Sequence, residues 1–118
     1  MKWMVKFLPE AVNDLRKLDN SIRARVLSVI LKLEIDPLNY GLPLGNKLGL
    51  DLTAFFKITP SDGYRVVYFV QKNEVLVTII SIGKREKEKV YKNAALRIER
   101  LRTMANIELQ RLDSLLGN

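Results

Sequence analysis

The sequence contains neither cysteine nor histidine among its 118 residues. Without cysteine it can form no disulfide framework and no thiolate metal site. Without histidine it lacks the commonest metal ligand and the usual proton carrier at neutral pH. Any catalysis on this chain would therefore use lysine, arginine, tyrosine or carboxylate side chains. We expect no metal ion and no other cofactor.

Long apolar runs are also missing. The longest, residues 75–82, is interrupted by Thr78 and Ser81 and is far shorter than the roughly 20 residues of a membrane span. Lys6 interrupts the apolar patch near the N-terminus and Pro9 follows it, so no signal peptide is predicted. We expect a cytoplasmic protein without membrane contact.

Basic residues outnumber acidic ones by 20 to 13, which gives a net charge of +7. The excess is concentrated in residues 83–102, where eight residues are basic and three acidic. Such a surface favours a polyanionic partner, most simply nucleic acid, or an acidic protein. For residues 84–89 alone, the alternative is a solvated helix face of alternating charge.

The first part of the chain predicts a strand followed by a helical hairpin. Residues 2–7 alternate between polar and apolar, which is typical of a strand with one buried face. Pro9 suits the first position of a helix, and residues 19–21 suit the start of a second helix that ends before Asp36. Residues 36–52 predict a loop, with Leu42, Leu44, Leu48 and Leu50 tucked against the core.

The second part predicts a sheet and a final helix. Three antiparallel strands are expected, the last two joined by a two-residue loop at Lys72 and Asn73; they cover residues 53–58, 64–70 and 75–82. The fold class is therefore α+β, a four-stranded, mainly antiparallel sheet with an N-terminal helical hairpin and a long C-terminal helix. We expect one domain over residues 1–118.

The final helix should run from Glu86 to Leu116, with residues 99–118 as a helical extension. Its apolar residues recur every three or four positions and form one long stripe: Ala94, Ile98, Leu101, Ala105, Leu109, Leu112 and Leu116. This stripe needs a partner surface. It could be covered by this domain, by a second copy or by another protein.

Arg65 and Arg85 stand out because they flank apolar strands. Alternation places Arg65 on one face of the central strand. If Ile58 pairs with Tyr64, Lys57 lies directly opposite Arg65, an arrangement unfavourable by up to about 1 kcal/mol unless an anion lies between the two cations. This pattern favours a phosphate site. Alternatively, Lys57 reaches solvent and Arg65 pairs with an acid such as Asp51 or Glu74.

The order of the motifs FKI, GYRVVY, IGKRE and VY, between Phe56 and Tyr91, resembles the RelE-like toxins of the RelE/ParE superfamily. EAVNDLRKLD and NKL in the first half are also similar, so the resemblance covers residues 2–98. It implies the toxin of a type II toxin–antitoxin module, a ribosome-dependent and metal-independent endoribonuclease that cleaves mRNA. The implied partners are an antitoxin, the ribosome with its mRNA, and operator DNA bound together with the antitoxin.

The resemblance also implies roles for individual residues. Arg65 would stabilise the scissile phosphate and Arg85 would act at the leaving 5′-oxygen. Tyr91 would stack on or orient the nucleotide, and Lys57 would lie near the attacking 2′-hydroxyl. The implied RNA-binding residues are Lys47, Lys84 and Lys87. RelE-like proteins often have a second basic residue where this chain has Thr59, so Lys84 or a ribosomal group could replace it as the base.

This chemistry agrees with the composition. Attack by the RNA's own 2′-hydroxyl requires orientation and charge stabilisation rather than a metal or a protein nucleophile. Without histidine, we expect weak activity on free RNA and a large contribution from positioning by the ribosome. The alternatives are a ParE-like inhibitor of DNA gyrase, a non-catalytic nucleic-acid or antitoxin-binding module, and a toxin that keeps the fold but has lost activity.

Overall fold

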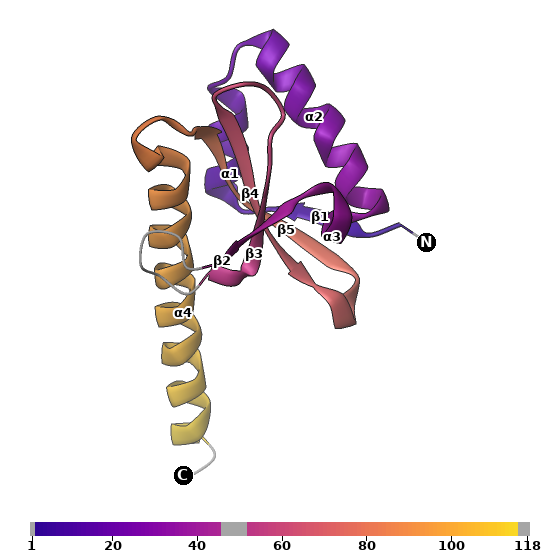
Figure 1. The fold of residues 1–118 in the computed structure, drawn as a ribbon. Coiled ribbons are helices and arrows are strands. Elements are labelled where there is room, and N and C mark those ends of the chain that lie inside the picture. The colour runs from indigo at the N-terminus through magenta and orange to yellow at the C-terminus, as the bar shows by residue number, and fades with distance from the viewer. Residues whose placement is uncertain (1, 46–51, 116–118) are drawn as a thin grey trace.

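The central element of the fold is a five-stranded mixed sheet (Figure 1). The structure is a computed structural model that describes residues 2–45 and 52–115. The strands follow the order β1-β5-β4-β3-β2, with β1 parallel to β5 and the other pairs antiparallel. Their bounds are Met4–Phe7 (β1), Leu42–Gly45 (β2), Leu52–Ile58 (β3), Tyr64–Gln71 (β4) and Leu76–Lys84 (β5).

The α+β class is confirmed, but the predicted count of four strands is one too low. The additional strand, β2, lies in the segment that was predicted to be a loop, and it pairs with β3 at the edge of the sheet. In the sequence, Pro43 disfavours a strand because proline cannot donate a backbone hydrogen bond. An edge strand tolerates proline, since one side of its backbone has no neighbouring strand to bond. Leu44 is buried as predicted whereas Leu42 is exposed, and Leu48 and Leu50 lie outside the described residues.

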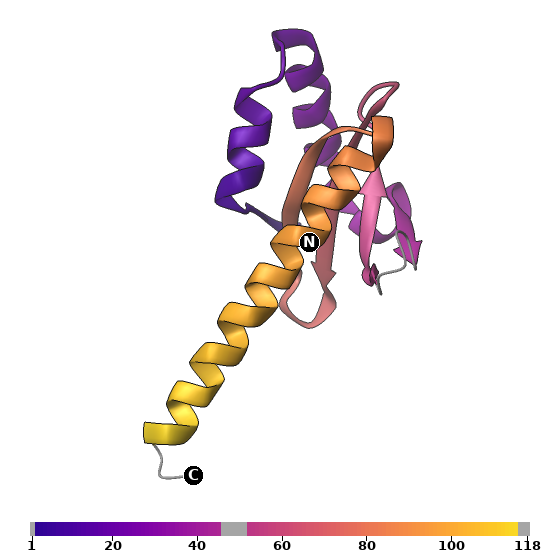
Figure 2. The same ribbon diagram turned by 90° about the vertical axis from the view of Figure 1, so that its left-hand side faces the viewer.

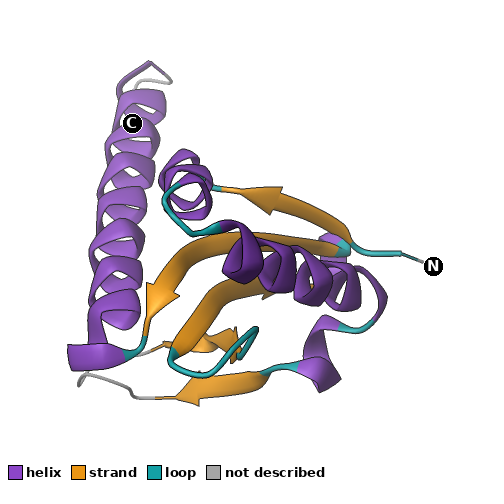
Figure 3. Cartoon of the chain, turned by 90° about the horizontal axis from the view of Figure 1, so that it is seen from above, coloured by secondary structure: helices purple, strands orange, loops and turns teal. Residues whose placement is uncertain are grey.

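The helical hairpin is confirmed and covers one face of the sheet (Figure 3). Helix α1 (Pro9–Arg16) begins at Pro9, and α2 (Asn20–Ile35) is capped by Asp19, whose carboxylate accepts a 3.0 Å hydrogen bond from the Ile22 N–H. The short helix α3 (Pro37–Tyr40) follows α2. The core beneath the hairpin combines residues of α2 with one face of β4: Val26, Val29, Ile30, Leu33, Val66, Tyr68 and Val70.

Tyr68 makes the stability of this core depend on alkaline pH. Its ring is fully buried, and its hydroxyl donates a 2.6 Å hydrogen bond to the carbonyl of Pro37. Burial, and to a smaller extent the charge of Asp36, raises the pKa of Tyr68 above its ordinary value. The folded protein therefore keeps a proton that the unfolded chain releases. The stability from Tyr68 is complete below about pH 10 and declines above it.

We expect Tyr68→Phe to reduce this alkaline loss. At about pH 8 the variant should be less stable than the parent by about 1 kcal/mol, because a buried hydrogen bond is removed. Above about pH 10 the gap should narrow, since Tyr68 of the unfolded parent ionises while the folded protein keeps the proton, which costs the parent up to about 1.4 kcal/mol of stability per pH unit. Urea denaturation of both proteins across this range measures the difference. Equal slopes of unfolding free energy against pH would contradict the assignment to Tyr68.

The connection between β4 and β5 differs from the predicted two-residue loop. Gln71 pairs with Leu76, so four residues separate the strands; three of them form a 3₁₀ turn, Lys72–Glu74, and Val75 follows with a positive φ of 51°. A two-residue type I′ turn requires positive φ at both central residues, which glycine or asparagine adopts far more readily than lysine. The longer loop avoids that conformation at Lys72.

Helix α4 (Lys89–Leu115) covers the other face of the sheet and extends well beyond it (Figure 2). A 3₁₀ turn, Glu86–Glu88, precedes it, so the helix begins three residues later than predicted. Its first turns pack on Val67 and Ile80 of the sheet through four buried residues, Val90, Tyr91, Ala94 and Ile98. Farther along, Leu101 and Met104 are exposed. Within residues 2–45 and 52–115, no helix is long and apolar enough to cross a membrane.

Candidate active site

The candidate site lies under α4, near the end of the sheet where β4 begins and β5 ends. Arg65 is the second residue of β4 and pairs with Gly83 of β5. Alternation along β4 places Arg65 on the same sheet face as Val67 and Phe69. These two residues belong to the cluster beneath α4, so this is the face that α4 covers. Arg65 thus introduces a cation at the border of an apolar interface.

The contacts of Arg65 differ from the alternative in which it pairs with Glu74. Its Nη1 donates a 2.7 Å hydrogen bond to the backbone carbonyl of Tyr64. Glu74, one of the acids considered, lies instead within 3.5 Å of the side-chain amide of Gln71. Asp51, the other acid, is outside the described residues. The guanidinium of Arg65 is directed toward Tyr91, which brings the sheet and α4 together.

Tyr91 reaches this site from the first turn of α4 and is 1% exposed. Burial raises the pKa of its hydroxyl, and the charge of Glu88 acts in the same direction. The charge of Arg65 and its hydrogen bond to Tyr91 oppose this shift, as does the charge of Arg85. Because the pKa remains raised overall, the hydroxyl is protonated at neutral pH. It can donate a hydrogen bond and cannot serve as the resting proton acceptor.

Lys57 comes from β3 and completes the cationic side of the site. Its Nζ lies 5.9 Å from the centroid of the Tyr91 ring, a distance at which the ring attracts a cation. The predicted position directly opposite Arg65 is wrong, since Lys57 pairs with Val67 and Ile58 with Val66. Lys57 and Arg65 still share a face of the sheet. The observed register differs from the predicted one by two residues, and side chains along a strand return to the same face every two residues.

The turn between β3 and β4 explains the changed register. Pro60 has no N–H and cannot extend the ladder, so β3 ends at Ile58. The chain then reverses through Gly63, whose φ is 77°, and the Tyr64 N–H donates a 3.1 Å hydrogen bond to Ser61 O. Seven residues, rather than five, therefore separate the first paired residues of the two strands.

Arg85 is anchored to the same end of the sheet through its backbone. Its N–H donates a 2.8 Å hydrogen bond to the carbonyl of Gly63, just before β4. The side chain is exposed, and its charge lowers the pKa of Tyr91. The structure therefore gathers Arg65, Tyr91 and Lys57 at one point and places Arg85 at the rim.

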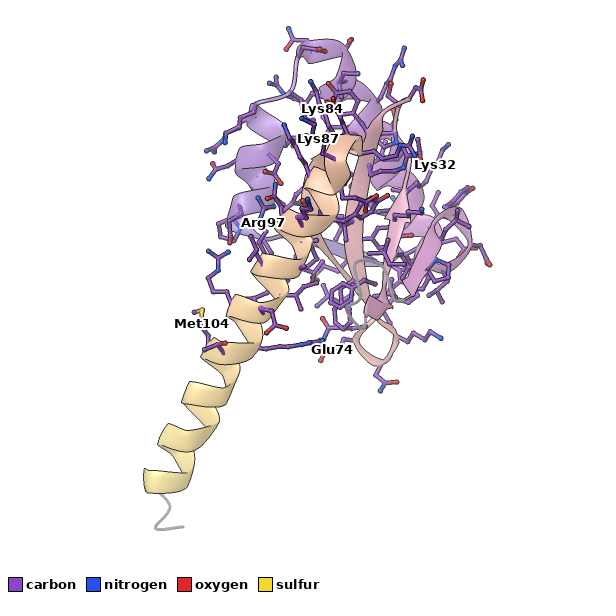
Figure 4. All side chains as sticks on the ribbon, turned by 60° about the vertical axis from the view of Figure 1, so that its left-hand side comes forward. Lys32, Glu74, Lys84, Lys87, Arg97 and Met104 are labelled. Carbon is purple, nitrogen blue, oxygen red and sulfur yellow. The ribbon has the colours of Figure 1, made fainter. Side chains whose placement is uncertain are left out.

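The predicted RNA-binding lysines do not form one group. Lys84 pairs with Tyr64 and lines a pocket with Lys17 and Asp19 on the helical-hairpin face of the sheet, opposite to Arg65. Lys87 is exposed in the 3₁₀ turn before α4 (Figure 4). Lys47 lies outside the described residues. Thr59 is exposed at the end of β3, so it does not replace the second basic residue of the family pattern.

Sequence reasoning missed two charged residues on the helices that flank the sheet, Asp14 of α1 and Arg97 of α4. They form an ion pair of 2.6 Å that joins α1 to α4, and both side chains are largely buried. The sequence predicts for Asp14 only a favourable charge toward the N-terminal end of its helix, whereas the structure places it in the second half of α1. The sequence did contain one signal of this pair. Arg97 directly precedes Ile98 of the apolar stripe, so a cation lies next to the face of the helix that is expected to be buried.

Comparisons with known proteins agree with this architecture. The family model of the ParE toxin of the type II toxin–antitoxin system parDE matches residues 5–89. The mRNA interferase toxin RelE of Escherichia coli K12 is 33% identical over 99 residues, which cover 83% of this chain and 99% of the relative.

Solved structures of E. coli RelE are similar as well. A double arginine mutant in the free state has a TM-score of 0.67 and 30% identity, covering 83% of this chain and 99% of that one. The same mutant in complex with a peptide of the antitoxin RelB has a TM-score of 0.60 and 29% identity, covering 80% and 95%. The residues matched by the family model include β3, β4 and β5, which carry Lys57 and Arg65.

Proposed function

Because this chain belongs to the RelE/ParE superfamily of type II toxin–antitoxin toxins, we propose that it is an endoribonuclease that cleaves mRNA on the ribosome. The observation that carries the proposal is the meeting of Arg65, Tyr91 and Lys57 at the border of an apolar interface. Two cations around one buried tyrosine form an environment suited to a phosphate group, because both can donate hydrogen bonds to its oxygens.

The reaction we propose is attack of a ribose 2′-oxygen on the adjacent phosphorus. The 2′-hydroxyl loses its proton, the bond from phosphorus to the 5′-oxygen breaks, and that oxygen gains a proton. The products are a 2′,3′-cyclic phosphate and a 5′-hydroxyl, and water is not consumed. This route uses no protein nucleophile and no metal, which suits a chain without histidine or cysteine.

Each site residue has a role that its chemistry supports. The planar fork of Arg65 can bind two phosphate oxygens and stabilise the charge that grows on them in the transition state. Arg85, at the rim, is suited to the leaving 5′-oxygen. The protonated Tyr91 can donate a hydrogen bond to the phosphate or stack on a base with its ring.

The reaction also needs a group that accepts the proton of the 2′-hydroxyl. Arginine holds its proton too strongly to act as a base, and Tyr91 remains protonated at neutral pH because its pKa is raised. Lys57 is then the candidate base among the residues that meet at the site, because a neighbouring cation such as Arg65 favours the neutral, proton-accepting form of an amine, whereas Lys84 lies on the other sheet face. We propose that Lys57 accepts the proton, or that a ribosomal group does so while Lys57 orients the 2′-hydroxyl.

We also propose a cognate antitoxin as the partner that restrains this activity. RelE of E. coli forms a complex with an antitoxin peptide, and the net charge of +7 on this chain would favour an acidic partner. The antitoxin and the ribosome would then compete for one cationic surface. Binding to operator DNA together with the antitoxin belongs to the same proposal.

Induction of the protein in cells, followed by mapping of new 5′ ends, tests the reaction. We expect 5′-hydroxyl ends inside translated messages, in phase with codons. In Arg85→Ala these ends should be on the order of 10-fold fewer, because charge stabilisation at the leaving oxygen is lost. If Arg85→Ala remains as toxic as the parent and DNA supercoiling is disturbed, the protein is a gyrase inhibitor and the proposal fails.

A further inference from the structure

The link between β5 and α4 contains two residues in an uncommon backbone conformation. Lys87 and Glu88, immediately before α4, have positive φ values of 54° and 61°, which are uncommon for residues other than glycine. The contact face of the helix is apolar and includes the small residue Ala94 next to Val90 and Ile98. Apolar packing is non-directional, so a directional contact adds a constraint on the rotation of α4.

The outer edge of β5 offers backbone groups for such a contact. β1 pairs with β5 only as far as Ile79, and β5 bulges at Ile80, where its register with β4 shifts. The Ile80 carbonyl and the Ile82 N–H therefore lie beyond the last pair with β1. Both residues are buried, and buried backbone groups require hydrogen-bond partners.

Asp14 and Arg97 supply those partners from two different helices. The Nη1 of Arg97 donates to Ile80 O over 2.9 Å, and the Ile82 N–H donates to Asp14 Oδ2 over 3.0 Å. The two side chains also bind each other through contacts of 2.6 and 3.1 Å. This bidentate pair joins α1, β5 and α4 at one point, with Arg97 between α4 and the hairpin (Figure 4).

We propose that Asp14 and Arg97 are positioning residues, which fix the rotation of α4 and so hold Tyr91 against Arg65. A bidentate ion pair constrains both the distance and the angle between the two side chains. The hydrogen bonds to β5 fix the pair relative to the strand that is paired with β4 at Arg65. Arg97 follows Tyr91 by six residues on one helix, about 9 Å along its axis. Any rotation of α4 at Arg97 is therefore transmitted to the Tyr91 ring.

The consequence for cleavage rests on the proposed function. A displacement of about 1 Å at a reacting group can slow a reaction on the order of 100-fold. We expect Arg97→Lys, which keeps the charge but loses the planar fork, to lower the cleavage rate constant by at least about 10-fold. KM should change little, because the Arg97 guanidinium is already engaged by Asp14 and the Ile80 carbonyl.

A second readout does not require activity. With 3-fluorotyrosine incorporated, the ¹⁹F resonance of Tyr91 can be assigned as the signal missing from Tyr91→Leu. In Arg97→Lys this resonance should shift, because the ring moves relative to Arg65. Arg100→Lys is the matched control: Arg100 lies three residues later and pairs with Glu10 of α1, but its side chain is 57% exposed. This control should leave both rate and resonance unchanged.

A double-mutant cycle separates positioning from a general loss of structure. If Arg97 acts through Tyr91, Arg97→Lys should cause little further loss of rate in a Tyr91→Leu background. Losses that multiply would overturn the proposal, and so would an unshifted Tyr91 resonance in Arg97→Lys. If the parent cleaves no RNA, the proposed function fails, and the Tyr91 resonance alone tests whether Arg97 positions the ring. If Arg97→Lys does not fold, Asp14→Glu replaces it in each measurement.

Discussion

Arg65→Ala should lower mRNA cleavage by about 100- to 1,000-fold while leaving the fold intact. Arg65 is the cation that the sheet itself presents to the site, and its hydrogen bond reaches the buried Tyr91. Removal of one preorganised donor to a developing negative charge costs about 2.7 to 4 kcal/mol of transition-state stabilisation. The measurement is the rate of cleavage of ribosome-bound mRNA by purified parent and variant proteins.

Arg25→Ala is the matched control for that prediction. It removes the same charge from α2, on the other side of the sheet, where Arg25 donates a 2.9 Å hydrogen bond to Ser61 Oγ. We expect cleavage within about twofold of the parent, because loss of a distant surface charge weakens only the general attraction to RNA. Equal losses in Arg25→Ala and Arg65→Ala would mean that net charge, rather than a built site, determines activity.

Gly41→Ala should destabilise the fold by about 3 kcal/mol. A Cβ added at Gly41 would lie 1.9 Å from the Tyr68 hydroxyl oxygen and 2.9 Å from the carbonyl oxygen of Lys57. Neither group can move freely, since Tyr68 is fully buried and hydrogen-bonded to Pro37 and the carbonyl belongs to β3. Overpacking costs about 1 to 3 kcal/mol and a disrupted buried hydrogen bond adds about 1 to 3. Urea denaturation measures the loss.

The cause of that loss can be checked with two further variants. At Gly83 the nearest atom to an added Cβ is Val90 Cβ at 3.9 Å, an ordinary contact, so Gly83→Ala should stay within about 1 kcal/mol of the parent. In a Tyr68→Phe background the shortest clash is absent, and Gly41→Ala should then cost less than in the parent. Additive losses in this cycle would show that the Tyr68 hydroxyl is not the obstacle.

Local rules predicted the parts of the fold that depend on neighbouring residues. Pro9 and Asp19 begin their helices where their backbone chemistry suggests, and period-two alternation assigned Val66 and Val67 of β4 to the correct faces. The shared face of Lys57 and Arg65 followed from the same rule. The class of the fold and the sheet-to-helix origin of the site were therefore available from the sequence.

Features that depend on tertiary contacts were not available in this way. The register of Lys57 differs from the prediction because the turn between β3 and β4 takes up seven residues instead of five, and β2 escaped prediction because Pro43 is tolerated at a sheet edge. The pair of Asp14 and Arg97 joins residues 83 positions apart. The pair binds backbone groups of β5 that have no strand partner, because β1 is short and β5 bulges at Ile80. These features are known only from the structure.

Arg65 from the sheet and Tyr91 from α4 are proposed to form one site that cleaves mRNA. A reaction of purified protein with mRNA on translating ribosomes tests this proposal. We expect 5′-hydroxyl and 2′,3′-cyclic phosphate ends with the parent, and a loss of at least about 100-fold in Arg65→Ala. Undiminished cleavage by Arg65→Ala, or no cleavage by the parent together with inhibition of DNA gyrase, would contradict it.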